Sequence, residues 1–140
     1  MYLIVEPTYP GFTPKKSLVV KNEHEMPYRD QGYLQVHWAH NGKNVFGMED
    51  GLCELERVNL ITFNAMTVGQ PHAHVDVTEE MWCVVDGKNL EMLGKEIRWM
   101  GEGECFKIPP NGKVPHSHIN STDEPMIFLY FARFRDREDR

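Results

Sequence analysis

Residues 69–87 read GQPHAHVDVTEEMWCVVDG, a stretch in which two histidines precede two glutamates. In an extended chain, residues i and i+2 point to the same side, so the imidazoles of His72 and His74 converge on one point. Glu79 and Glu80 follow at the start of an apolar run that is typical of a strand. Two imidazoles and one carboxylate bind a metal ion while leaving positions open for substrate or oxygen. The stretch therefore predicts a metal site between neighbouring strands.

A second histidine pair lies further along the chain, in residues 103–120, which read GECFKIPPNGKVPHSHIN. An imidazole from His116 would complete a shell of three nitrogens and one oxygen. One such pair is a weak signal, but two pairs at turn-to-strand boundaries, beside a glutamate pair, favour a metal site. The remaining histidines, which we interpret as ordinary surface or core residues, are His24, His37 and His40.

Short apolar segments separated by glycine and proline fill the chain from residue 32 onward. The turn residues Gly94 and Lys95 lie between two of these segments and predict a tight hairpin. Several short strands at this spacing predict a β-sandwich or a β-barrel. The expected strands are residues 32–39, 58–68, 81–85, 90–93, 96–100, 105–108 and 125–134.

The two histidine stretches resemble the two motifs of the cupin family. The first family motif combines a glycine, His-x-His, a glutamate and a second glycine, and residues 69–87 match it with two departures. The spacer after Gly69 is shorter than in the family. The motif glutamate is either Glu79, by its spacing from the second histidine, or Glu80, by its spacing to Gly87. Residues 103–120 match the second motif, with one extra residue before the turn and one before the first histidine.

The resemblance implies an all-β fold, a cupin-type jelly-roll β-barrel of antiparallel strands with a metal in its mouth. It implies that His72, His74 and His116 are metal ligands, joined by Glu80 or Glu79. We favour Glu80, because the preceding loop absorbs an extra residue more easily than the strand absorbs a register slip. Such a slip would turn every side chain of the strand to the other face.

The choice of Glu80 also assigns the faces of its strand. The even-numbered residues from Glu80 to Val84 then face the interior, with Trp82 packed in the core, and the odd-numbered residues from Met81 to Val85 face outward. An outward apolar row must be covered, either by the N-terminal arm or by a second subunit. We therefore expect a homodimer, which is also common among small cupins.

His118 is the candidate catalytic residue. It lies on the same face as His116 if the segment is extended, so it would stand beside the metal as a base or face the substrate. A plain surface position is the alternative interpretation.

The ligand shell suits one divalent transition metal, which could be iron, manganese, nickel, cobalt, copper or zinc, because affinity alone does not select among them. The shell contains no thiolate, which argues against a closed structural zinc site. We expect a metal-dependent enzyme that acts on a small polar molecule, and we rank an iron-type oxygenase first. A metal-dependent isomerase, lyase or decarboxylase of a carbohydrate or carboxylate ranks second, and a non-catalytic cupin that binds a small ligand ranks third.

The composition limits which classes of partner the protein can bind. The formal net charge of −6 leaves no basic stripe of the kind that binds nucleic acid. No apolar run approaches the roughly 20 residues that span a bilayer. The three cysteines, Cys53, Cys83 and Cys105, cannot all pair with one another, and we interpret them as reduced thiols of a cytoplasmic protein.

A chain of 140 residues is enough for one domain. We expect an N-terminal arm over residues 1–30, with a possible edge strand at residues 18–20. A single cupin barrel should follow over residues 31–134, and residues 135–140 should form a charged C-terminal tail.

Overall fold

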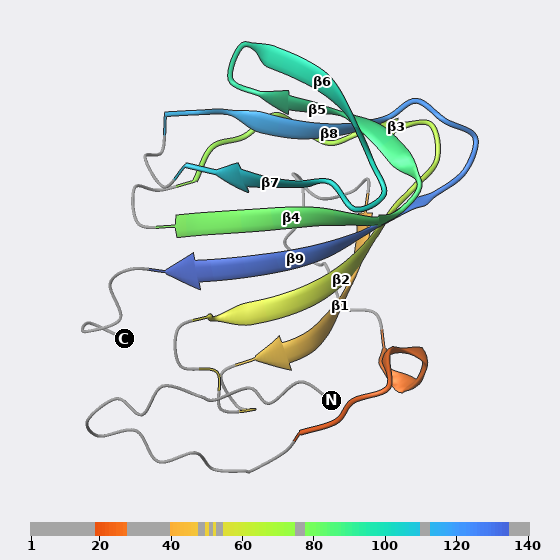
Figure 1. Cartoon of the computed structure of the whole chain (residues 1–140), viewed down its shortest axis with the longest axis vertical. Helices are drawn as coiled ribbons and strands as arrows, with labels where there is room; N and C mark the ends of the chain where they lie inside the picture. The colour runs from red at the N-terminus through yellow and green to blue at the C-terminus, as the bar shows by residue number, and fades with distance from the viewer. Residues whose placement is uncertain are drawn as a thin grey trace.

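The computed structural model describes residues 19–27, 40–47, 50, 52, 55–74, 78–109 and 113–134. These ranges contain nine strands in two antiparallel sheets and one short 3-10 helix, η1 (Glu23–Glu25). The sheets lie one above the other in Figure 1. Because the strands form two antiparallel sheets, the predicted all-β jelly-roll class is confirmed. No helix within these ranges is both long enough and apolar enough to cross a membrane.

The larger sheet has five strands in the order β1-β2-β9-β4-β7. Its last strand in the sequence, β9, therefore lies at the centre, between β2 and β4 (Figure 1). The bounds of its strands are β1 (His40–Gly47), β2 (Arg57–Phe63), β4 (Thr78–Asp86), β7 (Cys105–Ile108) and β9 (Met126–Phe134).

The smaller sheet has four strands in the order β3-β8-β5-β6. The hairpin of β5 and β6 turns at Gly94, whose φ of 62° lies in the left-handed region that glycine adopts without strain, as the sequence predicts. The bounds of its strands are β3 (Thr67–Val68), β5 (Lys88–Leu93), β6 (Glu96–Gly101) and β8 (His116–Asn120).

One predicted strand is divided. The segment 58–68 forms β2 in the larger sheet and β3 in the smaller one, with Met66 at a φ of 53° between them. A residue in the left-handed region interrupts an extended chain, so the chain changes sheets at this point. Val19 and Val20, in the possible edge strand, belong to no strand. The predicted strand 32–39 lies outside the described residues.

The core fills the space between the two sheets. Its largest fully buried apolar side chains are Phe63, Phe128, Ile108 and Met126. Along β4 the side chain of Trp82 is 4% exposed, whereas those of Met81 and Val85 are 45% and 50% exposed. The predicted register of this strand, with even-numbered residues inward, is confirmed.

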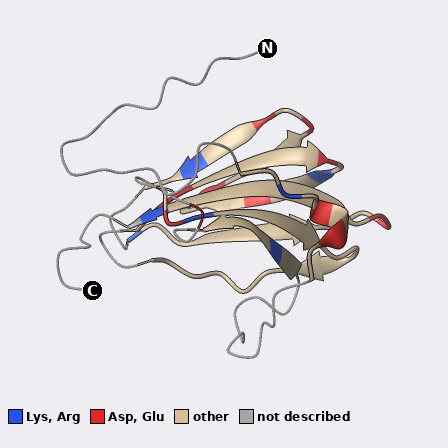
Figure 2. Cartoon of the chain, turned by 90° about the horizontal axis from the view of Figure 1, so that it is seen from below, with Lys and Arg blue, Asp and Glu red and all other residues tan. Residues whose placement is uncertain are grey.

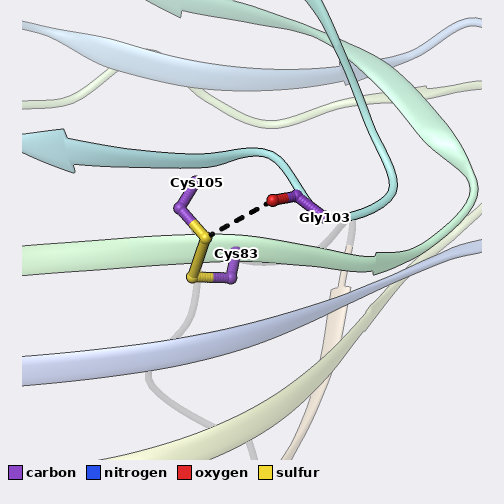
Figure 3. The surroundings of a disulfide bond; sticks show 3 residues. All are labelled: Cys83, Gly103 and Cys105. Atoms are coloured by element: carbon purple, nitrogen blue, oxygen red, sulfur yellow. Dashed lines mark hydrogen bonds between the residues drawn. A yellow bond between two sulfur atoms is a disulfide. The ribbon is translucent and has the colours of Figure 1, made fainter.

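Two of the cysteines form a disulfide. Cys83 of β4 and Cys105 of β7 lie directly opposite each other, with their Cα atoms 4.1 Å apart (Figure 3). The interpretation of these two cysteines as reduced thiols is therefore wrong. They are 22 residues apart in the sequence, and they become neighbours because the β5–β6 hairpin between them folds into the other sheet. Cys53 lies outside the described residues.

Charged residues of both signs are distributed over several strands. In Figure 2 the basic positions are separated from one another, and acidic positions lie among them. Together with the net charge of −6, this gives the described surface an acidic balance rather than a basic face.

Candidate metal centre

The backbone brings the two histidine stretches together. His72 follows β3 and forms an isolated antiparallel bridge with His116, the first residue of β8. The amide of His72 donates to the carbonyl of His116 at 3.1 Å, and the amide of His116 donates to the carbonyl of His72 at 2.9 Å. This pair of hydrogen bonds fixes the side chains of both residues at the same end of the sheet.

Three imidazoles meet at this bridge. The ring centroid of His116 lies 4.3 Å from that of His72 and 4.9 Å from that of His74. One nitrogen from each of the three rings lies within 4.8 Å of the others. His116 is buried, and the other two residues are partly exposed, so the cluster is partly accessible to solvent.

The fourth residue of this cluster comes from the opposite sheet. Glu80 of β4 is 4% exposed, and its Oε2 lies 3.1 Å from Nε2 of His74 and 3.8 Å from Nε2 of His116. The hydroxyl of Tyr130 donates to Oε1 at 2.5 Å, and the indole of Trp82 donates to Oε2 at 3.2 Å. Two donors from neighbouring core residues therefore hold this carboxylate toward the histidines.

The neighbouring Glu79 points to the other side of β4. Its carboxylate forms an ion pair with Lys107 of β7. The structure therefore brings Glu80, and not Glu79, to the three histidines. We call His72, His74, Glu80 and His116 the metal cluster.

Burial controls the charge of the histidines in this cluster. Desolvation, with a smaller contribution from the nearby His72, lowers the pKa of His116 from 6.5 to about 3. Desolvation also lowers the pKa of His72. Both rings are therefore neutral at pH 7, which is the form whose nitrogens can bind a metal.

The carboxylate of Glu80 is ionised in spite of its burial. Desolvation alone would raise its pKa, but the contacts with His74, Tyr130 and His116 outweigh that effect and lower it to about 2. Burial raises the pKa of Tyr130, as does the adjacent negative charge of Glu80. Tyr130 consequently remains a protonated hydrogen-bond donor to this carboxylate.

Several nitrogens of the cluster lack a hydrogen-bond partner among the described residues. They are Nε2 of His74 and both ring nitrogens of His116, all of them buried. The 3.1 Å contact between His74 and Glu80 does not have the geometry of a hydrogen bond. Buried polar atoms are ordinarily paired, and a metal ion would satisfy these nitrogens together with the carboxylate. The residues present thus fit a divalent metal.

A family model described as "Cupin domain" matches residues 59–131, which include both histidine stretches and the whole metal cluster. This chain belongs to the cupin family. No curated protein matches the sequence of this cupin. Members of the family commonly bind a divalent metal, and the three histidines of this cupin form a group that could hold one.

Solved structures share the fold of this cupin at low sequence identity. The polyketide cyclase RemF from Streptomyces resistomycificus has a TM-score of 0.70 and 17% identity, over 83% of this chain and 79% of RemF. A predicted oxalate decarboxylase from Thermotoga maritima has a TM-score of 0.69 and 12% identity, over 83% and 99% of the chains. KdgF from Halomonas sp. has a TM-score of 0.62 and 22% identity, over 82% and 94%. At these identities the likeness establishes the fold.

His118 is buried in this cupin beside the metal cluster. It is 4% exposed, and its ring centroid lies 6.3 Å from that of His116. Its Nδ1 lies 2.7 Å and 2.9 Å from the two carboxylate oxygens of Glu91, the residue opposite it on β5. The surface interpretation of His118 is therefore wrong. The rings of Trp82 and Phe128 pack against it, at 4.3 Å and 5.0 Å between centroids.

Glu91, Tyr130 and the hydrogen-bonding role of Trp82 were not predicted from the sequence. For Glu91 a signal was present, because a glutamate in an otherwise apolar strand is unusual unless it is exposed or paired. For Tyr130 and Trp82 there was none, since a strand aromatic is most often a core residue. Only the position of β9 beside β4 shows that the Tyr130 hydroxyl reaches Glu80.

Proposed function

We propose that this cupin is a metal-dependent enzyme that acts on a small polar molecule, with His72, His74, Glu80 and His116 as ligands of one divalent transition metal. The observation that supports this most directly is the convergence of three imidazoles and one carboxylate, in which the buried Nε2 of His74 and both ring nitrogens of His116 have no hydrogen-bond partner among the described residues. Two of the imidazoles are held neutral by burial, and the carboxylate is held ionised. His72, His116 and Glu80 are therefore in the protonation states that metal binding requires.

The residues around the cluster have distinct roles in this proposal. A bound divalent metal supplies positive charge that stabilises negative charge developing on a substrate oxygen. Tyr130 and Trp82 hold the carboxylate of Glu80 in place, because each donates one hydrogen bond to it. His118 is the proposed catalytic base, oriented through its Nδ1 by Glu91.

We rank proton-transfer chemistry first, as an isomerase, lyase or decarboxylase of a carbohydrate or carboxylate. The observation that favours it is the buried pair of His118 and Glu91 beside the metal cluster. Such a reaction needs a base close to the metal. Two similar structures are named as a polyketide cyclase and a predicted oxalate decarboxylase. The iron-type oxygenase that the sequence ranked first becomes the second candidate, because the ligand set remains compatible with iron.

Metal analysis of the protein as isolated is the first test, followed by turnover assays without oxygen on a panel of sugars, hydroxy acids and keto acids. We expect about one divalent metal per chain and turnover that does not need oxygen. His118→Ala should keep the metal and lose at least ~100-fold in turnover, the smallest usual contribution of a general base. A strict need for oxygen would favour the oxygenase. A metal-free protein whose thermal stability is unchanged by His72→Ala would be a non-catalytic ligand-binding cupin.

We also propose that this cupin forms a homodimer. The exposed Met81 and Val85 of β4 form an outward apolar row, which a second copy of the chain would cover. A cytoplasmic location stays a prediction. The disulfide between Cys83 and Cys105 removes the argument from reduced thiols that supported it, because disulfides are rare in the cytosol.

A further inference from the structure

A second site lies away from the metal cluster, in a cavity of about 280 Å³. Its walls include β6, which is the edge strand of the smaller sheet, and β7, which is the edge strand of the larger one. No residue of the metal cluster lines it. The cavity therefore lies between the edges of the two sheets, where no backbone hydrogen bonds pair the described strands β6 and β7. We call it the seam cavity.

The deepest polar group of the seam cavity is Glu91, which is 3% exposed. Its Oε1 accepts a hydrogen bond from the side-chain amide of Asn89, and its carboxylate also contacts Nδ1 of His118. A carboxylate offers about four acceptor positions, so these two partners leave acceptor capacity unused. The Oδ1 of Asn89 is also a buried acceptor without a partner among the described residues. This part of the interior therefore has more acceptors than donors.

The charged residues that line the seam cavity are mostly acidic. Glu96 and Glu104 line it together with Glu91, whereas the one basic lining residue is Arg98. The guanidinium of Arg98 lies 3.6 Å from the carboxylate of Glu104, so these two charges largely offset each other. Two carboxylates then remain, which disfavours an anion and favours a cation in the cavity.

The remaining walls are apolar. Leu93, Met100 and Phe106 line the seam cavity, and Met100 is 3% exposed. An occupant with an apolar body would bury its surface against these side chains, which favours binding.

We propose that the seam cavity binds a small protonated amine with an apolar body. The ammonium group donates charge-assisted hydrogen bonds to the free acceptor positions of Glu91, and the apolar body packs against Leu93, Met100 and Phe106. Glu96 adds negative charge near the opening. This site uses none of the metal cluster residues, but it shares Glu91 with the proposed catalytic machinery, because Glu91 also contacts Nδ1 of His118.

Three probes with one phenyl group each and different polar ends test the proposal: phenethylamine, 2-phenylethanol and 3-phenylpropanoate. Each is titrated into the full-length protein with ¹³C-labelled methionine methyl groups. Met100 reports on the seam cavity, and Met126, which is fully buried in the core and does not line it, is the internal control. We expect phenethylamine to shift the Met100 signal at about tenfold lower concentration than the other two probes, with Met126 unchanged.

Glu91→Gln should weaken phenethylamine binding about tenfold, since a neutral amide replaces the charged acceptor. Because Glu91 is buried and this variant could fail to fold, the exposed Glu96→Gln gives a second test, with an expected loss of about threefold. Glu102→Gln is the matched control, as Glu102 is exposed and does not line the cavity. Equal binding of all three probes, or unchanged phenethylamine binding in Glu96→Gln and in folded Glu91→Gln, overturns the proposal.

Discussion

At the scale of single residues, two adjacent glutamates have opposite surroundings. Glu80 faces the three histidines, and Glu79 pairs with Lys107 on the other side of the strand. We predict that Glu80→Gln lowers the metal content of the protein at least tenfold after dialysis, because a neutral amide replaces an ionised ligand. Elemental analysis measures it, and Glu79→Gln is the matched control that should keep its metal. If Glu79→Gln lost its metal while Glu80→Gln kept it, the carboxylate ligand would be Glu79 instead of Glu80.

Protonation of the metal cluster gives a prediction for the metal-free protein. The pKa of His116 is lowered from 6.5 to about 3 by burial, so the unfolded chain binds this proton more readily than the folded chain. Stability is then fully present above pH 6.5 and falls as the pH falls toward 3. Glu80, whose pKa is lowered from 4.5 to about 2, adds a further loss below pH 4.5.

The measurement is the melting temperature of the chelator-treated protein between pH 8 and pH 3.5. We expect a decline that begins near pH 6.5 and steepens below pH 4.5. His116→Gln removes one of the two histidines whose pKa burial lowers, the other being His72, and should reduce the decline between pH 6.5 and 4.5. A melting temperature that stays constant over this range would contradict the neutral, buried state of His116.

At the scale of elements, β5 is a strand whose position was predicted from sequence but whose inward face was not. The apolar pattern identified the strand and its hairpin with β6, but Asn89 and Glu91 face the interior while Leu90 and Met92 are only half-buried. Polar residues point inward here because each finds a partner on the neighbouring strand β8 or on the same strand. Alternation alone would assign the opposite faces, because it assumes an apolar interior.

The metal cluster was easier to predict than the strands. Its histidine spacing is a local feature, and the i, i+2 rule holds wherever the chain is extended. The division between β2 and β3 was not predictable in this way, because Met66 adopts a left-handed conformation that non-glycine residues seldom take. Which sheet each half joins depends on partners about 50 or more residues away, Asn120 for Thr67 and Phe131 for Val58.

The pairing of β4 with β7 gives a prediction about oxidation state. The disulfide between Cys83 and Cys105 closes a loop between residues 22 positions apart, and such a cross-link usually contributes ~2–4 kcal/mol. We expect Cys105→Ser to lower the melting temperature by several degrees and to abolish the effect of a reductant on it. Cys53→Ser is the control in which the effect of the reductant should persist. An unchanged melting temperature in Cys105→Ser would count against the cross-link in solution.

At the scale of the whole molecule, the outer face of the larger sheet predicts the oligomeric state. We expect light scattering to give twice the chain mass of 16.3 kDa. The double variant Met81→Lys, Val85→Lys should be monomeric, because two charges would replace the apolar row of β4. Ile97→Lys on β6 is the matched control, since Ile97 is 60% exposed on the other sheet and should leave the dimer intact. A monomeric parent protein would contradict the prediction.

The central position of β9 has a consequence for how the molecule is made. Residues 126–134 pair with β2 on one side and β4 on the other, so the larger sheet is incomplete until these residues have been synthesised. During synthesis β2 and β4 therefore each have an unpaired edge until β9 is made. Unpaired strand edges are prone to pair with strands of another chain. Contacts between such distant segments also slow folding. The nascent chain should therefore be most prone to aggregate before β9 inserts between β2 and β4.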